Sequence, residues 1–161
     1  MKSEGGILNK AKDYLDKVAT PKVRAFNEPS FGEGPMGTLH GERSDADGYK
    51  FLRVTLFGSP LIKTVKGCKI EFKSDSGKVT CNSDTKDIES TYSHSLGKGI
   101  TTFEIYLDEE LHQSLKAPIT AMSITFNKKF FGKDILSFDI QNKKFAKILK
   151  SSPKSSNSRK N

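Results

Sequence analysis

Residues 68 to 81, CKIEFKSDSGKVTC, alternate strictly between apolar and polar side chains on both sides of a short polar turn. The apolar positions are Cys68, Ile70 and Phe72 before the turn and Val79 and Cys81 after it. Because successive side chains in a strand point to opposite faces, only one register puts both apolar sets on the same face. We therefore predict a β-hairpin with Phe72 opposite Val79 and Ile70 opposite Cys81.

The same two-residue period recurs along the chain and predicts the fold class. Strand patterns rich in aromatic and β-branched residues occupy residues 49–58, 100–107, 119–126 and 135–141. In the last two, we expect Met122 and Ile124 to face Leu136 and Phe138. We predict a mainly β (α+β) protein of about five to seven strands, built as an antiparallel β-sandwich or partly open barrel.

Helical spacing is confined to three short segments. Residues 1–20 contain an amphipathic helix over 5–19, which the Thr20-Pro21 step ends. A second helix is predicted near 108–116, with Asp108 as its N-cap and Pro118 beyond its end. A C-terminal helix is predicted from Phe145, Ile148 and Leu149, which lie at helical spacing and face the sheet.

The remaining segments complete the domain organisation. Residues 21–150 form a single β-rich domain, in which the Gly- and Pro-rich stretch 27–48 is predicted to be a long irregular loop. Residues 151–161 have almost no apolar side chains and predict a disordered basic tail.

The chain has two cysteines, Cys68 and Cys81, and three interpretations of them remain open. In the predicted register Cys68 faces Ser83 and is only diagonal to Cys81. Diagonal neighbours lie about 7–8 Å apart, beyond the usual Cα separation of about 4.4–6.8 Å in a disulfide. A zinc site needs four ligands, and no second cysteine pair is present. We favour two core thiols over a disulfide or a metal site, and expect no metal and no cofactor.

No sequence motif marks a catalytic centre. Gly32 to Gly37 formally match GxGxxG, but no strand-then-helix pattern surrounds them and Pro35 removes a backbone donor. No nucleophile is paired with a base in a known motif. We assign no catalytic residue, and a small hydrolase with an unrecognised site is our second alternative function.

The net charge of +8 lies entirely at the C-terminal end. Residues 1–120 sum to zero, whereas residues 121–161 are lysine-rich and contain only Asp134 and Asp139 as acids. The string NKKF occurs twice there and supplies the candidate contact residues Lys128, Lys129, Phe130, Lys143 and Lys144. Lysines neutralise phosphates and an exposed ring stacks on a base, so nucleic-acid or polyanion binding is our first alternative function.

Residues 100–149 resemble small, uncharacterised β-rich proteins of Bacteroidetes-type bacteria. The resemblance rests on YLDEELHQSLK (106–116), on Ile119 and Ile124, and on FDIQNKKF (138–145) with Leu149. It implies a strand, a short helix, two strands and a final helix, and it implies no activity or cofactor.

These observations favour a non-enzymatic binding or assembly module, either a subunit or an adaptor. We expect it to contact a protein partner through the N-terminal helix, the segment 27–48 and the basic C-terminal end. Within 27–48 the candidate contact residues are Phe31, Met36 and His40. No apolar run reaches the roughly 18 residues of a membrane span, and no secretory signal pattern is visible, so we expect a cytoplasmic protein.

Overall fold

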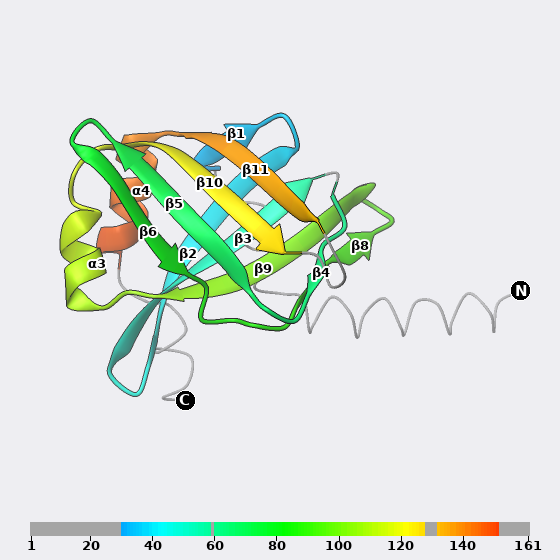
Figure 1. The fold of residues 1–161 in the computed structure, drawn as a ribbon, viewed down its shortest axis with the longest axis horizontal. Helices are drawn as coiled ribbons and strands as arrows, with labels where there is room; N and C mark the ends of the chain where they lie inside the picture. Colours follow the sequence, from blue (N-terminus) through cyan, green and yellow to red (C-terminus); the bar gives the residue numbers. More distant parts are fainter. Residues whose placement is uncertain (1–29, 59, 128–131, 152–161) are drawn as a thin grey trace, which may run out of the picture.

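The computed structural model describes residues 30–58, 60–127 and 132–151 as a mainly β structure with two helices. The larger sheet is antiparallel, with nine strands in the order β6-β5-β10-β11-β1-β2-β3-β9-β8, and β4 and β7 form a separate pair (Figure 1). The strands are β1 (Gly32–Gly34), β2 (Gly37–Ala46), β3 (Tyr49–Gly58), β4 (Lys63–Thr64), β5 (Cys68–Ser74), β6 (Gly77–Asn82), β7 (Ile88–Glu89), β8 (Thr91–Ser93), β9 (Lys98–Tyr106), β10 (Ile119–Asn127) and β11 (Lys133–Ile140). The helices are α3 (Glu109–Ser114) and α4 (Asn142–Lys150).

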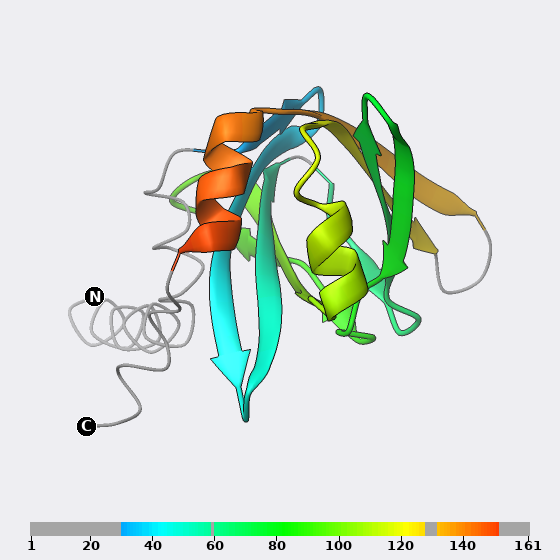
Figure 2. The same cartoon turned by 90° about the vertical axis from the view of Figure 1, so that its left-hand side faces the viewer.

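The nine-stranded sheet curls into a half-barrel. Its two margins meet at one point beyond β6, where the Asp84 amide donates to the Glu104 carbonyl of β9 at 2.7 Å. The Glu104 amide in turn donates to Thr85 Oγ1 at 2.9 Å. Away from this point the walls separate, and α3 lies between the β5–β6 wall and the β2–β3 wall (Figure 2). The predicted mainly β class is confirmed, with an open, curled sheet rather than a sandwich.

Residues 32–34 and 37–46 are strands, not the irregular loop that we expected over 27–48. The glycines that suggested a loop instead allow backbones to approach closely. A Cβ on Gly34 would lie 2.2 Å from the Ser137 carbonyl oxygen, and one on Gly37 would lie 2.2 Å from that of Phe57. The glycine- and proline-rich sequence therefore corresponds to a tight hairpin between β1 and β2.

The predicted register of the 68–81 hairpin and the predicted shared apolar face of β10 and β11 are confirmed. Phe72 pairs with Val79 and Ile70 with Cys81, while Met122 pairs with Phe138 and Ile124 with Leu136. These apolar side chains line the core together with the inward-facing residues of β3 and β9. The bulky aliphatic side chains that are fully buried include Leu39, Leu52, Leu56, Ile70, Ile88 and Ile105.

The two described helices occur where they were predicted. Asp108 caps α3, since its Oδ1 accepts the Leu111 amide at 2.7 Å. On α4, Phe145 and Leu149 are buried, and the Phe145 ring lies 5.2 Å from that of Phe31. The end of α4 is held by Arg43 of β2, whose Nη1 donates to the Leu149 carbonyl at 2.7 Å.

Two predicted segments fall outside the described residues: the helix within 1–20, and residues 152–161 of the tail. Within the residues that are described, no helix combines the length and the hydrophobicity that crossing a bilayer requires.

Candidate functional site

The structure separates the three contact residues that we expected in the segment 27–48. Met36 is 39 % exposed in the turn between β1 and β2. Phe31 is fully buried against Phe145, and His40 is 5 % exposed, with its Nε2 3.1 Å from Thr38 Oγ1. Phe31 directly precedes β1 and His40 lies in β2, and both strands are central in the sheet. The two residues therefore occupy buried positions rather than the exposed loop surface that we expected.

Of the predicted basic contact residues, the structure describes only those on α4. Lys128, Lys129 and Phe130 lie outside the described residues. Lys143 and Lys144 are exposed on the first turn of α4, and Lys147 and Lys150 are exposed further along the same helix. No ion pair found among the described residues involves these four lysines.

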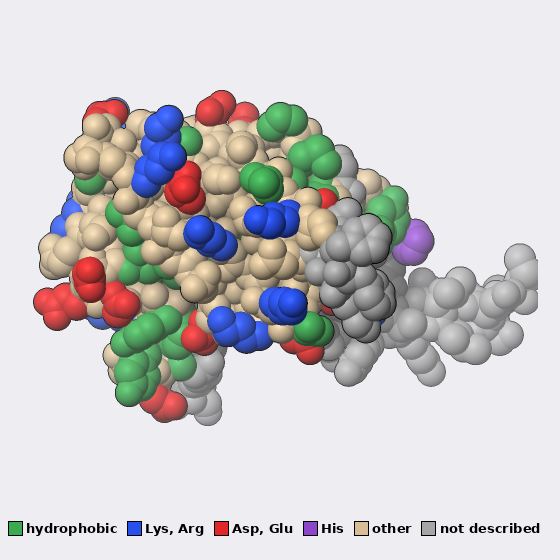
Figure 3. All heavy atoms as spheres, viewed as in Figure 1, with side chains coloured by type: hydrophobic (Ala, Val, Ile, Leu, Met, Phe, Trp, Pro, Cys, Tyr) green, Lys and Arg blue, Asp and Glu red, His purple; other side chains and the backbone are tan. Residues whose placement is uncertain are grey.

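The most prominent aromatic feature was missed by the sequence analysis. Tyr49 and Tyr106 are 57 % and 39 % exposed, and their rings meet edge to face with centroids 5.8 Å apart. The half-buried Phe51 ring lies 5.6 Å from that of Tyr106. We call these three residues the aromatic patch. It lies at the projecting end of the β2–β3 hairpin, where hydrophobic side chains gather in the space-filling view (Figure 3).

Strand register builds the aromatic patch. Phe51 pairs with Tyr106 across β3 and β9, and Tyr49 pairs with Ala46 across the Asp47-Gly48 turn. Asp47 and Gly48 both have positive φ, at 52° and 84°, as a two-residue type I′ hairpin requires. The aromatic rings therefore project from a defined turn and not from a free loop.

An ion-pair row next to the aromatic patch ties three strands together. Arg53 of β3 donates from Nη1 to Glu42 of β2 at 3.0 Å and from Nη2 to Glu104 of β9 at 3.3 Å. Ser44 also donates to Glu104, at 3.3 Å. This row links β2, β3 and β9 on the same face as the rings, at the next residue pair along that face.

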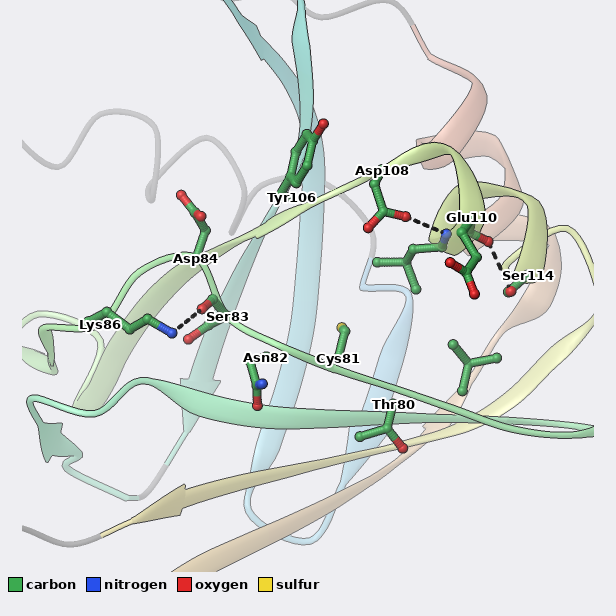
Figure 4. Close-up of a pocket in the computed structure, with 12 residues that line it drawn as sticks. Thr80, Cys81, Asn82, Ser83, Asp84, Lys86, Tyr106, Asp108, Glu110 and Ser114 are labelled. Atoms are coloured by element: carbon green, nitrogen blue, oxygen red, sulfur yellow. Dashed lines mark hydrogen bonds between the residues drawn. The ribbon is translucent and has the colours of Figure 1, made fainter.

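Two hollows lie beside the aromatic patch, and Tyr106 and Asp108 line both. The first, which we call the β6–α3 hollow, has a volume of about 450 Å³. Its walls are β6 with the following turn on one side and the end of β9 with α3 on the other (Figure 4). Its lining residues are Val79, Thr80, Cys81, Asn82, Ser83, Asp84, Lys86, Tyr106, Asp108, Glu110, Leu111 and Ser114.

The thiol that lines the β6–α3 hollow, Cys81, has a raised pKa and is therefore a poor nucleophile. Burial raises the pKa of the Cys81 thiol from an ordinary value of 9.0 to about 12, and the Asp108 carboxylate adds to the rise. The pKa of Cys68 is likewise raised to about 12, chiefly by burial. Both cysteines are free; Cys68 is a buried core thiol as predicted, whereas Cys81 is only half-buried and packs against the core from the hollow. A catalytic cysteine needs the opposite shift, because the thiolate is the nucleophile.

The second hollow, of about 440 Å³, lies between the hairpin turn and α3 and is lined in part by Tyr49, Lys50, His112 and Lys116. Burial lowers the pKa of His112, and the positive charges of Arg43, Lys50 and Lys116 lower it further. Both effects favour the neutral form of the His112 imidazole.

Neither the geometry of the described residues nor the comparisons point to a metal site. Among the described residues, no group of three or more His, Cys, Asp or Glu side chains is arranged to hold a metal ion. Comparison of the chain with protein-family models, curated proteins and solved structures gave no match. The function must therefore be argued from the surface of this chain.

Proposed function

We propose that the protein is a non-enzymatic binding module that contacts a protein partner through the aromatic patch of Tyr49, Phe51 and Tyr106. The observation that carries the proposal is the pair of exposed tyrosines held edge to face at a projecting hairpin. Tyrosine and phenylalanine are enriched at the centres of protein interfaces, where a rigid ring buries much area at a small cost in entropy.

The surroundings of the aromatic patch support the same function. The ion-pair row of Glu42, Arg53 and Glu104 holds the supporting strands in place. The hollows on either side offer room for partner side chains. Interface residues that are ordered before binding lose less entropy when the complex forms.

Site-specific photocrosslinking tests the proposal. A photoreactive phenylalanine analogue replaces Tyr49 in cells of the native host, and the matched control places it at Tyr92, a 48 % exposed tyrosine that packs edge to face on His94. We expect one discrete protein adduct from position 49 and none from position 92. The adduct should disappear when Tyr106→Ser is added. Equal adducts from both positions, or none from position 49, would refute the proposed surface.

A second candidate function is polyanion binding by α4. Its four exposed lysines, Lys143, Lys144, Lys147 and Lys150, stand on a helix without acidic residues. Lysine–phosphate contacts make affinity fall with salt, with a slope of about 0.7 per contact for single strands. Filter binding of a single-stranded oligonucleotide at several salt concentrations tests this function. The variant Lys143→Glu/Lys144→Glu should bind more weakly and with a smaller slope, while the control Lys73→Glu on β5 should not. No complex at low salt would remove this candidate.

A further inference from the structure

The outer edge of β6 has backbone groups that no strand among the described residues pairs. The Ser83 amide donates to the Cys68 carbonyl of β5 at 2.9 Å, so Ser83 points toward β5. The Asp84 amide donates to Glu104 on the opposite side. Because backbone groups alternate in direction along an antiparallel strand, Val79 and Cys81 point toward β5, while Thr80 and Asn82 point away from it.

These outward groups border the β6–α3 hollow. Thr80 and Asn82 line it, and no backbone hydrogen bond from the described residues reaches them on that side. Figure 4 shows Cys81 on the β6 side of the hollow, with Asp108 and Glu110 on the α3 side. The hollow is therefore a gap in the half-barrel, bounded on one side by a strand edge that can accept another strand.

The side chains around the gap are mainly acidic, and they favour a strand that carries positive charge. Asp84, Asp108 and Glu110 line it, and none of the ion pairs found among the described residues includes them. Among the described residues of the lining the one cation is Lys86, which donates to the Ser83 carbonyl at 3.3 Å. The exposed ring of Tyr106, at the end of β9, lines the hollow from the α3 side, and a guanidinium group stacks favourably on such a ring.

We infer that the β6–α3 hollow binds an extended, arginine- or lysine-bearing segment of the partner protein, which adds to the free edge of β6 as a further strand. Backbone hydrogen bonds to Thr80 and Asn82 would hold the segment, and its cationic side chains would face Asp84, Asp108 and Glu110. Strand addition of this kind takes affinity from the main chain and specificity from alternate side chains. The inference names the partner segment and rests on the proposed protein-binding function.

A defined peptide probe tests the inference on the full-length protein. The probe is a fluorescein-labelled heptapeptide in which arginine and valine alternate, and binding is followed by fluorescence polarisation at low ionic strength. One control peptide carries glutamate in place of arginine, and a second carries N-methyl groups on alternate amides. We expect only the unmodified arginine peptide to bind. Binding of the methylated peptide with equal affinity, or no binding of the arginine peptide, would overturn the inference.

Matched variants separate the strand edge from the charge. Thr80→Pro removes an outward N–H that has no backbone acceptor in the part of the chain that the structure describes, and an edge strand tolerates proline at such a position. It should weaken probe binding by about tenfold or more, while Thr80→Val, which keeps the N–H, should not. Glu110→Lys should weaken binding by a similar factor, and Glu33→Lys, on the distant β1, should have no effect. Unchanged binding by both Thr80→Pro and Glu110→Lys would refute the assignment, provided that both variants keep the native circular dichroism spectrum.

Other occupants of the edge give distinct results. If the chain's own tail filled the gap, charge reversal of Lys154, Arg159 and Lys160 would tighten probe binding about tenfold, and the inference would fail. If a second copy of the chain filled the gap, sedimentation would show a dimer that Thr80→Pro dissociates, and the inference would fail. Tyr49 does not line this hollow. Crosslinking from position 49 without probe binding would therefore refute this inference and leave the proposed function standing.

Discussion

Exposure of the native protein to a thiol reagent is expected to leave both cysteines almost unmodified. Burial raises the pKa of Cys68 and of Cys81 from 9.0 to about 12. A rise of three pKa units lowers the thiolate fraction at about pH 8 by about a thousandfold. Since the thiolate is the reacting species, modification of each thiol should be slower by about the same factor in the folded protein than in the unfolded chain.

The assay compares the rate of reaction with an aromatic disulfide reagent in buffer and in concentrated urea, without reductant. We expect two thiols per chain to react rapidly in urea, because neither cysteine is in a disulfide. In buffer, both should react about a thousandfold more slowly, and Cys81→Ala identifies the remaining signal as that of Cys68. A native rate within about tenfold of the urea rate for either thiol would show that the reasoning from burial is wrong. Fewer than two titratable thiols in urea would show a bond that the structure does not contain.

Three further predictions concern stability. Phe145→Ala removes a fully buried ring that packs on Phe31 and Phe72, and it should lower the free energy of unfolding by about 3–5 kcal/mol in urea titrations. The control Lys144→Ala, on the exposed face of the same helix, should change that free energy by less than about 0.5 kcal/mol. Asp108→Ala removes the N-cap of α3 and should cost about 1 kcal/mol, and Asp108→Asn, which keeps an acceptor oxygen, should recover most of that loss in the same titration. Because the pKa of His112 is lowered in the folded protein, the unfolded chain takes up the proton at a higher pH than the folded protein does, and stability should fall as the pH drops below 6.5. Thermal unfolding measured between pH 7 and pH 5 should show a smaller loss of stability for His112→Gln.

The parts of the fold that were predictable are those with a local pattern. The 68–81 register followed from two-residue alternation, because a slip by one residue exposes Val79 and Cys81. The helix α3 followed from its N-cap, Asp108, and α4 from its apolar stripe. Each of these signals lies within a few residues of the structure that it predicts.

The segment 27–48 was wrongly predicted to be an irregular loop because glycine is favoured in two different structural settings. The same residue type that permits a loop also permits strands to approach closely, and only the neighbouring backbone at Ser137 and Phe57 distinguishes them. This misreading removed β1 and β2 from the predicted strands, and the two- and three-residue strands β4, β7 and β8 were too short to show a pattern.

The candidate site was not visible in the sequence because it depends on long-range pairing. Tyr106 meets Phe51 only through the β3–β9 register. The free edge of β6 becomes apparent only once Asp84 is seen to bond Glu104 while Thr80 and Asn82 remain beside a hollow. No local pattern carries that information.

Amide hydrogen exchange along β6, measured by NMR on the full-length protein without ligand, tests most directly whether a free strand edge borders the hollow. The account predicts alternation: slow exchange at Val79, Cys81 and Ser83, which face β5, and fast exchange at Thr80 and Asn82, which face the gap. Protection at Thr80 and Asn82 as strong as at Val79 and Cys81 would mean that the edge is already paired, and would contradict the account.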